Sequence, residues 1–135
     1  MSPLLLARGL FLVLLSIVTW LTVTPNPDDT QTGFALMRWV SELLLGNAEL
    51  NDKVAHFAAY GALGVSAFFA NIRLLGRQIW TVIALAIYGA FLEVLQGLGG
   101  VRQPEIADAV ANMLGAISGF GIGFLALRLF RKSRI

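Results

Sequence analysis

Three short segments of the chain carry polar side chains of the types that perform acid–base chemistry or bind a charged group. These residues are Asp52, Lys53, His56, Tyr60, Glu93, Gln96, Arg102, Asp108 and Asn112. Spacings of three or four residues within a segment place its polar side chains on one face of a helix. Ionisable residues in strongly apolar surroundings are costly, and a functional site facing the bundle interior is their usual explanation. We therefore predict one ligand-binding site, with Glu93, Asp108 and His56 as the candidates for catalysis.

The composition is that of an integral membrane protein. Of the 135 residues, 57% are hydrophobic and 13% are charged, whereas soluble domains average about 25% charged residues. The mean hydropathy is +0.76. A net charge of +2 is too small to indicate a nucleic-acid partner. The absence of cysteine excludes disulfides and thiolate-bound metals.

Four apolar runs predict an all-α, polytopic membrane protein built as a bundle of four transmembrane helices. In a single domain, residues 1–135, the predicted spans cover about 9–24, 53–72, 79–98 and 105–129. We interpret the first as an uncleaved helix because no small-x-small cleavage site follows it; a signal peptide is the competing interpretation. Residues 34–46 predict a short helix that lies along the membrane interface, or packs on the bundle as an ordinary loop helix.

Basic residues are distributed unevenly between the two sides that four spans create. Seven of the ten fall on one side: Arg8, Arg73, Arg77, Arg128, Arg131, Lys132 and Arg134. The positive-inside rule therefore predicts that both termini are cytoplasmic. The start of the second span, the end of the third and the start of the fourth then meet at the outer face, where the polar residues lie.

The carboxylate of Glu93 needs a partner, because a buried and unpaired carboxylate costs several kcal/mol or more. Arg102 and Lys53 are the basic residues placed to supply one. The polar residues also have structural explanations, such as a packing role for His56 or a hydrogen bond between helices for Asn112. An ion network that only stabilises the bundle would account for all of them.

Small residues occupy every fourth position along one stripe of the last predicted span. They are Ala111, Gly115, Gly119 and Gly123. Such stripes let another helix approach closely. We expect the third span to be that partner, which would hold Glu93 near Asp108 and Asn112.

No catalytic or metal-binding motif is complete. The serines lack the G-x-S-x-G context of hydrolases. The single histidine and the carboxylates lack a spacing such as H-E-x-x-H. The sequence therefore predicts no metal and no other cofactor.

Three motifs follow one another along the second half of the chain. They are D-K-x-x-H-x-x-x-Y from Asp52, G-x-x-x-E-x-x-Q from Gly89 and R-x-x-x-x-x-D-x-x-x-N-x-x-G from Arg102. Their order and separation resemble the VanZ-like family of small bacterial membrane proteins, although the family often has a proline and a glycine before the arginine. The resemblance implies a multi-pass protein of the bacterial inner membrane. The family's namesake is associated with teicoplanin resistance, and the resemblance assigns no biochemical activity.

Three functions remain open. The first is a protein that binds or handles the head group of an amphiphile, with membrane lipids or a lipid-linked envelope precursor as its partners. The second is an intramembrane enzyme that acts on such a lipid through Glu93, Asp108 and His56. The third is a structural or regulatory partner of another envelope protein, or a homo-oligomer. The variant Glu93→Gln separates the first two, because it abolishes acid–base chemistry and can spare binding.

Overall fold

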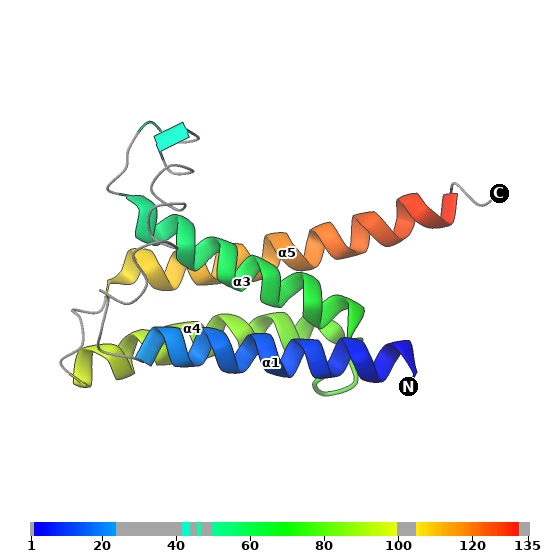
Figure 1. The fold of residues 1–135 in the computed structure, drawn as a ribbon, viewed down its shortest axis with the longest axis horizontal. Helices are drawn as coiled ribbons and strands as arrows, with labels where there is room; N and C mark the ends of the chain where they lie inside the picture. The colour runs from blue at the N-terminus through cyan, green and yellow to red at the C-terminus, as the bar shows by residue number, and fades with distance from the viewer. Residues whose placement is uncertain (1, 24–41, 44–45, 47–49, 100–104, 133–135) are drawn as a thin grey trace.

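The fold is a bundle of long α-helices (Figure 1). The computed structural model describes residues 2–23, 42–43, 46, 50–99 and 105–132. Within these residues the long helices are α1 (Pro3–Val23), α3 (Asn51–Phe69), α4 (Gln78–Leu98) and α5 (Ile106–Lys132), and none of the described residues forms a strand. The all-α prediction is therefore confirmed. The short helix predicted over residues 34–46 falls mostly on residues outside those described.

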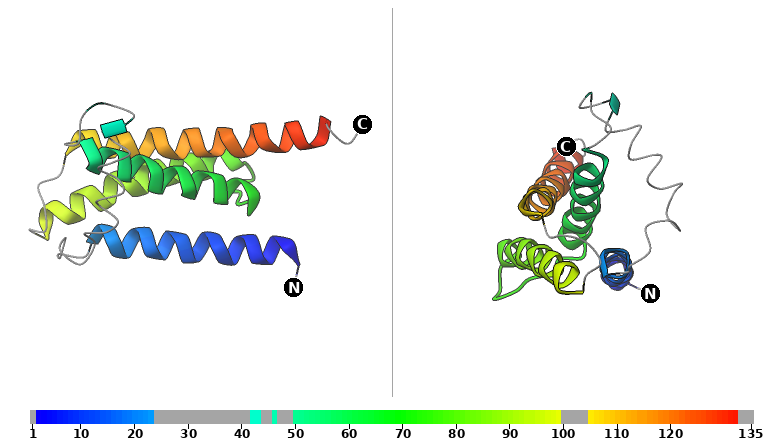
Figure 2. Two further views of the ribbon diagram at one scale, coloured as in Figure 1. Left: turned by 45° about the horizontal axis from the view of Figure 1, so that its top comes forward. Right: turned by 90° about the vertical axis from the view of Figure 1, so that its left-hand side faces the viewer.

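Helices that follow one another along the chain run in opposite directions, so α3 and α5 are parallel (Figures 1 and 2). Lys53 of α3 contacts Asp108 of α5 at one end of the bundle. At the other end the rings of Phe68 and Phe124 lie edge to face. The first turns of α3 and α5 therefore share one end of the bundle with the last turns of α1 and α4.

Three of the helices, α1, α4 and α5, are long and apolar enough to cross a membrane. Large apolar side chains cover the outside of the bundle; Leu10 and Trp20 of α1, for example, are 64% and 62% exposed. Helix α3 is less apolar because its first turns carry Asp52, Lys53 and His56. The described chain therefore has the surface of a membrane protein, and Glu93, Gln96, Asp108 and Asn112 are buried inside it.

Helix α1 begins at Pro3, several residues before the predicted apolar run. Proline suits a first helical turn because its missing N–H would have no partner there. Within α1, the Nε of Arg8 donates to the carbonyl of Ala70, 3.3 Å away, just after the end of α3. A cation at this position also complements the negative end of the α3 dipole. Arg8 thus ties α1 to α3.

Glycines bring α3 and α5 into the closest contact of the bundle. A methyl group on Gly119 would lie 1.9 Å from the carbonyl oxygen of Gly61, and one on Gly115 would lie 2.3 Å from that of Phe57. The expectation that α4 is the partner of the small-residue stripe is therefore wrong. The reason is that α3 has its own small residues, Gly61 and Gly64, at the same interface, so both backbones approach.

The remaining small residues of the stripe also face the interior. A methyl group on Gly123 would lie 2.8 Å from Cδ1 of Phe68 of α3. Ala111 is buried near the start of α5. The stripe therefore lines one face of α5 over several turns.

The connection between α3 and α4 is short and held by side chains. Helix α3 ends at Phe69, and Gly76 takes a φ of +76° that suits a residue without a side chain. Thr81 of α4 donates to the carbonyl of Ile72, 2.9 Å away, and Gln78 donates to that of Phe68. The first bond satisfies a carbonyl in the turn after α3, and the second adds a side-chain donor to a carbonyl that already accepts from the backbone N–H of Asn71.

Candidate functional site

Polar side chains from three helices converge at the end of the bundle where α3 and α5 begin. We call this group the polar cluster; it consists of Asp52, Lys53, His56, Glu93, Glu105, Asp108 and Asn112. Asp108 and Asn112 are each 1% exposed and Glu93 is 4% exposed. Helices that are far apart in the sequence therefore bury their ionisable groups together.

Lys53 is the cationic centre of the outer part of the polar cluster. Its Nζ lies 2.9 Å from Oδ1 of Asp108 and 3.6 Å from Oδ2 of Asp52, and it also contacts Oε2 of Glu105. Asp52 and Asp108 stand in the first turns of α3 and α5. The positive ends of two parallel helices meet there and favour negative side chains. One lysine and two helix ends thus offset the charge of the carboxylates.

His56 is the centre of the inner part. Its Nδ1 lies 3.0 Å from Oδ1 of Asn112 and 3.6 Å from Oε1 of Glu93. The amide nitrogen of Asn112 donates in turn to Oε1 of Glu93 across 3.5 Å. A carboxylate only accepts, so the Asn112 nitrogen faces Glu93 and its oxygen faces the imidazole. In the neutral ring, Nδ1 of His56 is therefore the nitrogen that donates to Asn112.

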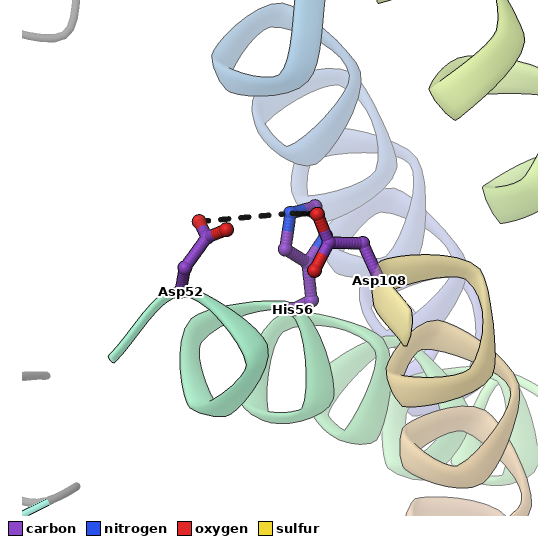
Figure 3. Close-up of side chains that lie close together, drawn as sticks. All are labelled: Asp52, His56 and Asp108. Carbon is purple, nitrogen blue, oxygen red and sulfur yellow. Dashed lines mark ion pairs between the residues drawn. The ribbon is translucent and has the colours of Figure 1, made fainter. Parts of the chain in front are cut away.

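The other imidazole nitrogen faces two aspartates (Figure 3). Nε2 of His56 lies 3.9 Å from Oδ1 of Asp52 and 4.0 Å from Oδ2 of Asp108. One ligand atom from each of these residues can be chosen so that all three lie within 4.8 Å of one another. This is a possible metal-ligand set, whereas the sequence predicted no metal. Its members come from two helices, so no local spacing reveals them.

Tyr60 lies one helical turn beyond His56 and deeper in the bundle. It is 1% exposed, and its hydroxyl has no hydrogen-bond partner among the described residues. A methyl group on Gly89 would lie 3.0 Å from Cε1 of Tyr60 and 2.9 Å from Cβ of Asn112. Gly89 therefore lets α4 close over these two side chains.

Gln96 and Glu105 differ from the sequence-based expectation, and the expectation for Arg102 stays a prediction. Gln96 donates to the carbonyl of Thr22, so the structure uses it to join α4 to α1. Arg102 lies outside the described residues. Glu105 was not predicted as a site residue, yet it contacts Lys53. Its spacing of three residues before Asp108, on the same predicted helix, was the available signal.

The polar cluster can bind a charged or zwitterionic group, move a proton through an oriented imidazole, or hold a cation. Lys53 and His56 are only partly buried, with side chains 24% and 14% exposed. Glu93 and Asp108 lie behind them and are almost fully buried. A group that enters the polar cluster therefore meets the lysine and the imidazole before it meets these two acids.

A comparison with protein families supports the resemblance noted in the sequence. The family described as VanZ/LLP1 matches residues 11–129. This match also includes most of α1, which carries none of the three motifs. No curated protein and no solved structure matches the chain. The match extends over most of the sequence and takes in the whole polar cluster, and the chain belongs to the VanZ/LLP1 family.

Proposed function

We propose that this chain is a multi-pass protein of the bacterial inner membrane whose polar cluster holds a lipid head group in the outer leaflet. The lipid is a membrane phospholipid or a lipid-linked envelope precursor. In this proposal α3 is a fourth span, and both termini are cytoplasmic. The observation that carries it is the burial of Glu93, Asp108 and Asn112 against His56 and Lys53 at one end of an otherwise apolar bundle.

The free-energy cost of burying these ionisable residues favours a binding role over an ion network that only stabilises the bundle. Ionisable residues within membrane helices are expensive, and they commonly mark the path or site of a substrate. Lys53 offers a cation to a phosphate, while the neighbouring carboxylates accept hydrogen bonds from hydroxyl or amino groups. The buried hydroxyl of Tyr60 adds a donor that makes no bond within the described residues. A polar head group would use all of these groups.

The orientation of the helices supports a site at one membrane surface. The members of the polar cluster belong to the first turns of α3 and α5 or to the last turns of α4, except Glu105, which directly precedes α5. The apolar remainder of each helix would then lie beside the lipid chains. Cytoplasmic termini follow from the basic residues at the opposite end of the bundle.

Mass spectrometry of the lipids that co-purify with the chain in mild detergent tests this function. The wild type should retain a defined lipid class in stoichiometric amount. Lys53→Met and Asp108→Asn should lose it, while Glu42→Gln, an exposed carboxylate outside the polar cluster, should retain it. Equal retention by all variants would place the lipid elsewhere on the protein.

A second candidate function is acid–base catalysis on the same lipid. The observation in its favour is the imidazole of His56, which Asn112 and Glu93 orient from one side while its other nitrogen faces Asp52 and Asp108. Glu93→Gln separates the two functions. If the site is catalytic, this variant should keep the bound lipid and stop its conversion, which mass spectrometry detects as loss of the product.

A role in glycopeptide resistance belongs to the same proposal. A protein that holds a lipid-linked envelope precursor alters the surface at which glycopeptides act. A strain that expresses the wild type should be less susceptible to teicoplanin than one that expresses Lys53→Met. Equal susceptibility at equal protein levels would separate the lipid site from resistance.

A further inference from the structure

We infer that Asp52, His56 and Asp108 form a binding site for a first-row divalent cation such as Zn²⁺. Nitrogen and carboxylate oxygen are the ligands that these ions take in proteins. The site shares side chains with the proposed lipid site, but it needs no lipid to bind the ion. A test of Zn²⁺ binding therefore does not depend on whether the proposed function is correct.

The imidazole of His56 faces the two aspartates with its Nε2. The amide of Asn112 donates to Glu93, so its oxygen accepts the proton on Nδ1 of His56. In the neutral ring, Nε2 then carries a lone pair. That lone pair points to the side where Oδ1 of Asp52 and Oδ2 of Asp108 lie. Three possible ligand atoms thus face one another, and a cation between them would be attracted to all three.

The three side chains lie near the separation that one shared ion requires. Nε2 of His56 lies 3.9 Å from the oxygen of Asp52 and 4.0 Å from that of Asp108. Two ligands that are each about 2.1 Å from one ion can be at most about 4.2 Å apart. Ligand atoms of the three residues can be chosen to lie within 4.8 Å of one another. Tetrahedral coordination brings ligand atoms to about 3.4 Å from one another, so each pair must close by about 0.5–1.4 Å, a movement that side-chain rotations provide.

Neighbouring side chains hold the three possible ligands in position. Lys53 contacts Oδ2 of Asp52 and Oδ1 of Asp108, which are the oxygens other than those that face the imidazole. Asn112 and Glu93 hold the opposite nitrogen of His56. Partners of this kind, bound to the far atoms of metal ligands, fix the ligands in position. Three protein ligands also leave a fourth position for water or for an oxygen of a head group.

The experiment uses the fact that His56 is the single histidine of the chain. The full-length protein, labelled with ¹⁵N-histidine, is stripped of metal with EDTA in detergent micelles and titrated with Zn²⁺ alone. Calorimetry should show one ion per chain. The NMR signal of Nε2 should shift on saturation, while Nδ1 keeps its proton. No lipid is added, so the result does not depend on lipid binding.

Variants show which side chains hold the ion. Asp52→Asn and Asp108→Asn should each weaken Zn²⁺ binding by at least about tenfold. The control Glu42→Gln should bind as the wild type does. Thermal unfolding of each variant without metal shows whether it is folded.

Three results would overturn the inference. They are the absence of saturable Zn²⁺ binding to the wild type, an Nε2 that carries a proton and does not respond to Zn²⁺, and binding that persists undiminished in both asparagine variants. The first two are read on the wild type and do not require any variant to fold. If lipid co-purifies with a chain that binds no Zn²⁺, the metal site fails while the proposed function stands.

Discussion

The side-chain oxygen of Asn112 lies 3.0 Å from Nδ1 of His56, which joins α5 to α3 inside the bundle. The other end of the same amide donates to Glu93 of α4. One asparagine therefore links three helices and fixes the orientation of the imidazole. Its loss should disturb both the stability of the bundle and the geometry of the polar cluster.

Asn112→Leu should lower the free energy of unfolding by about 1–3 kcal/mol, because it leaves Nδ1 of His56 and the carboxylate of Glu93 without this buried partner. Unfolding in detergent, followed by circular dichroism, measures the change. Met113→Ala, one residue further along α5 and 40% exposed, is the control and should change stability by less than about 0.5 kcal/mol. Equal stability of Asn112→Leu and the wild type would mean that the amide does not link the helices.

Substitution by alanine should change the free energy of unfolding differently at two glycines of α5. Gly119→Ala places a methyl group 1.9 Å from the carbonyl of Gly61, so α3 and α5 must move apart. We expect a loss of about 1–3 kcal/mol in the free energy of unfolding. Gly121→Ala meets no atom within 4 Å and should be neutral or stabilising by up to about 1 kcal/mol. Similar effects at both positions would show that this face of α5 does not pack on α3.

The small-residue stripe of α5 illustrates what the sequence could and could not predict about helix packing. A stripe of small residues identifies a face of α5 that another helix approaches, but it does not say which helix. Both α3, with Gly61 and Gly64, and α4, with Gly89, offer small residues to a neighbour. The choice between them depends on how both backbones fit together, which a pattern within one helix does not contain.

The convergence of the polar residues was easier to predict than their pairing. Alternating helix directions bring the start of α3, the end of α4 and the start of α5 together, so Lys53, Glu93 and Asp108 had to lie at one end. The contacts of Lys53 with Glu105 and Asp108, and of His56 with Asn112, depend on the rotation of each helix about its axis. Helical spacing gives a common face within a helix, but not the rotation of one helix relative to another.

Lys53 and Asp108 should be coupled in a double-mutant cycle. Removal of one partner leaves a charge in buried surroundings, so Lys53→Met and Asp108→Asn together should cost less than the sum of the two single changes. We expect a coupling energy of about 0.5–3 kcal/mol in the free energy of unfolding. Lys53→Met combined with Thr81→Val, at the other end of the bundle, should be additive. Additive effects of Lys53 and Asp108 would show that their contact contributes no stability.

Reporter insertions test whether α3 crosses the membrane. A reporter at Gly46, before α3, should be periplasmic, whereas reporters at Gly76, after α3, and at the carboxyl terminus should be cytoplasmic. Leu75, beside the second site, is 83% exposed, so an insertion is tolerated there. If Gly46 and Gly76 report the same side, α3 does not span the bilayer and the polar cluster does not open to the outer leaflet.

In our proposal the polar cluster holds a lipid head group. Photo-crosslinking in native membranes tests it most directly, with a phospholipid that carries a diazirine beside its phosphate. We predict labelling of peptides that contain His56, Glu93 or Asn112, and a loss of that labelling in Lys53→Met and Asp108→Asn but not in Glu42→Gln. Labelling confined to the opposite end of the bundle, near Arg8 and Arg77, or unchanged in both cluster variants, would contradict the account.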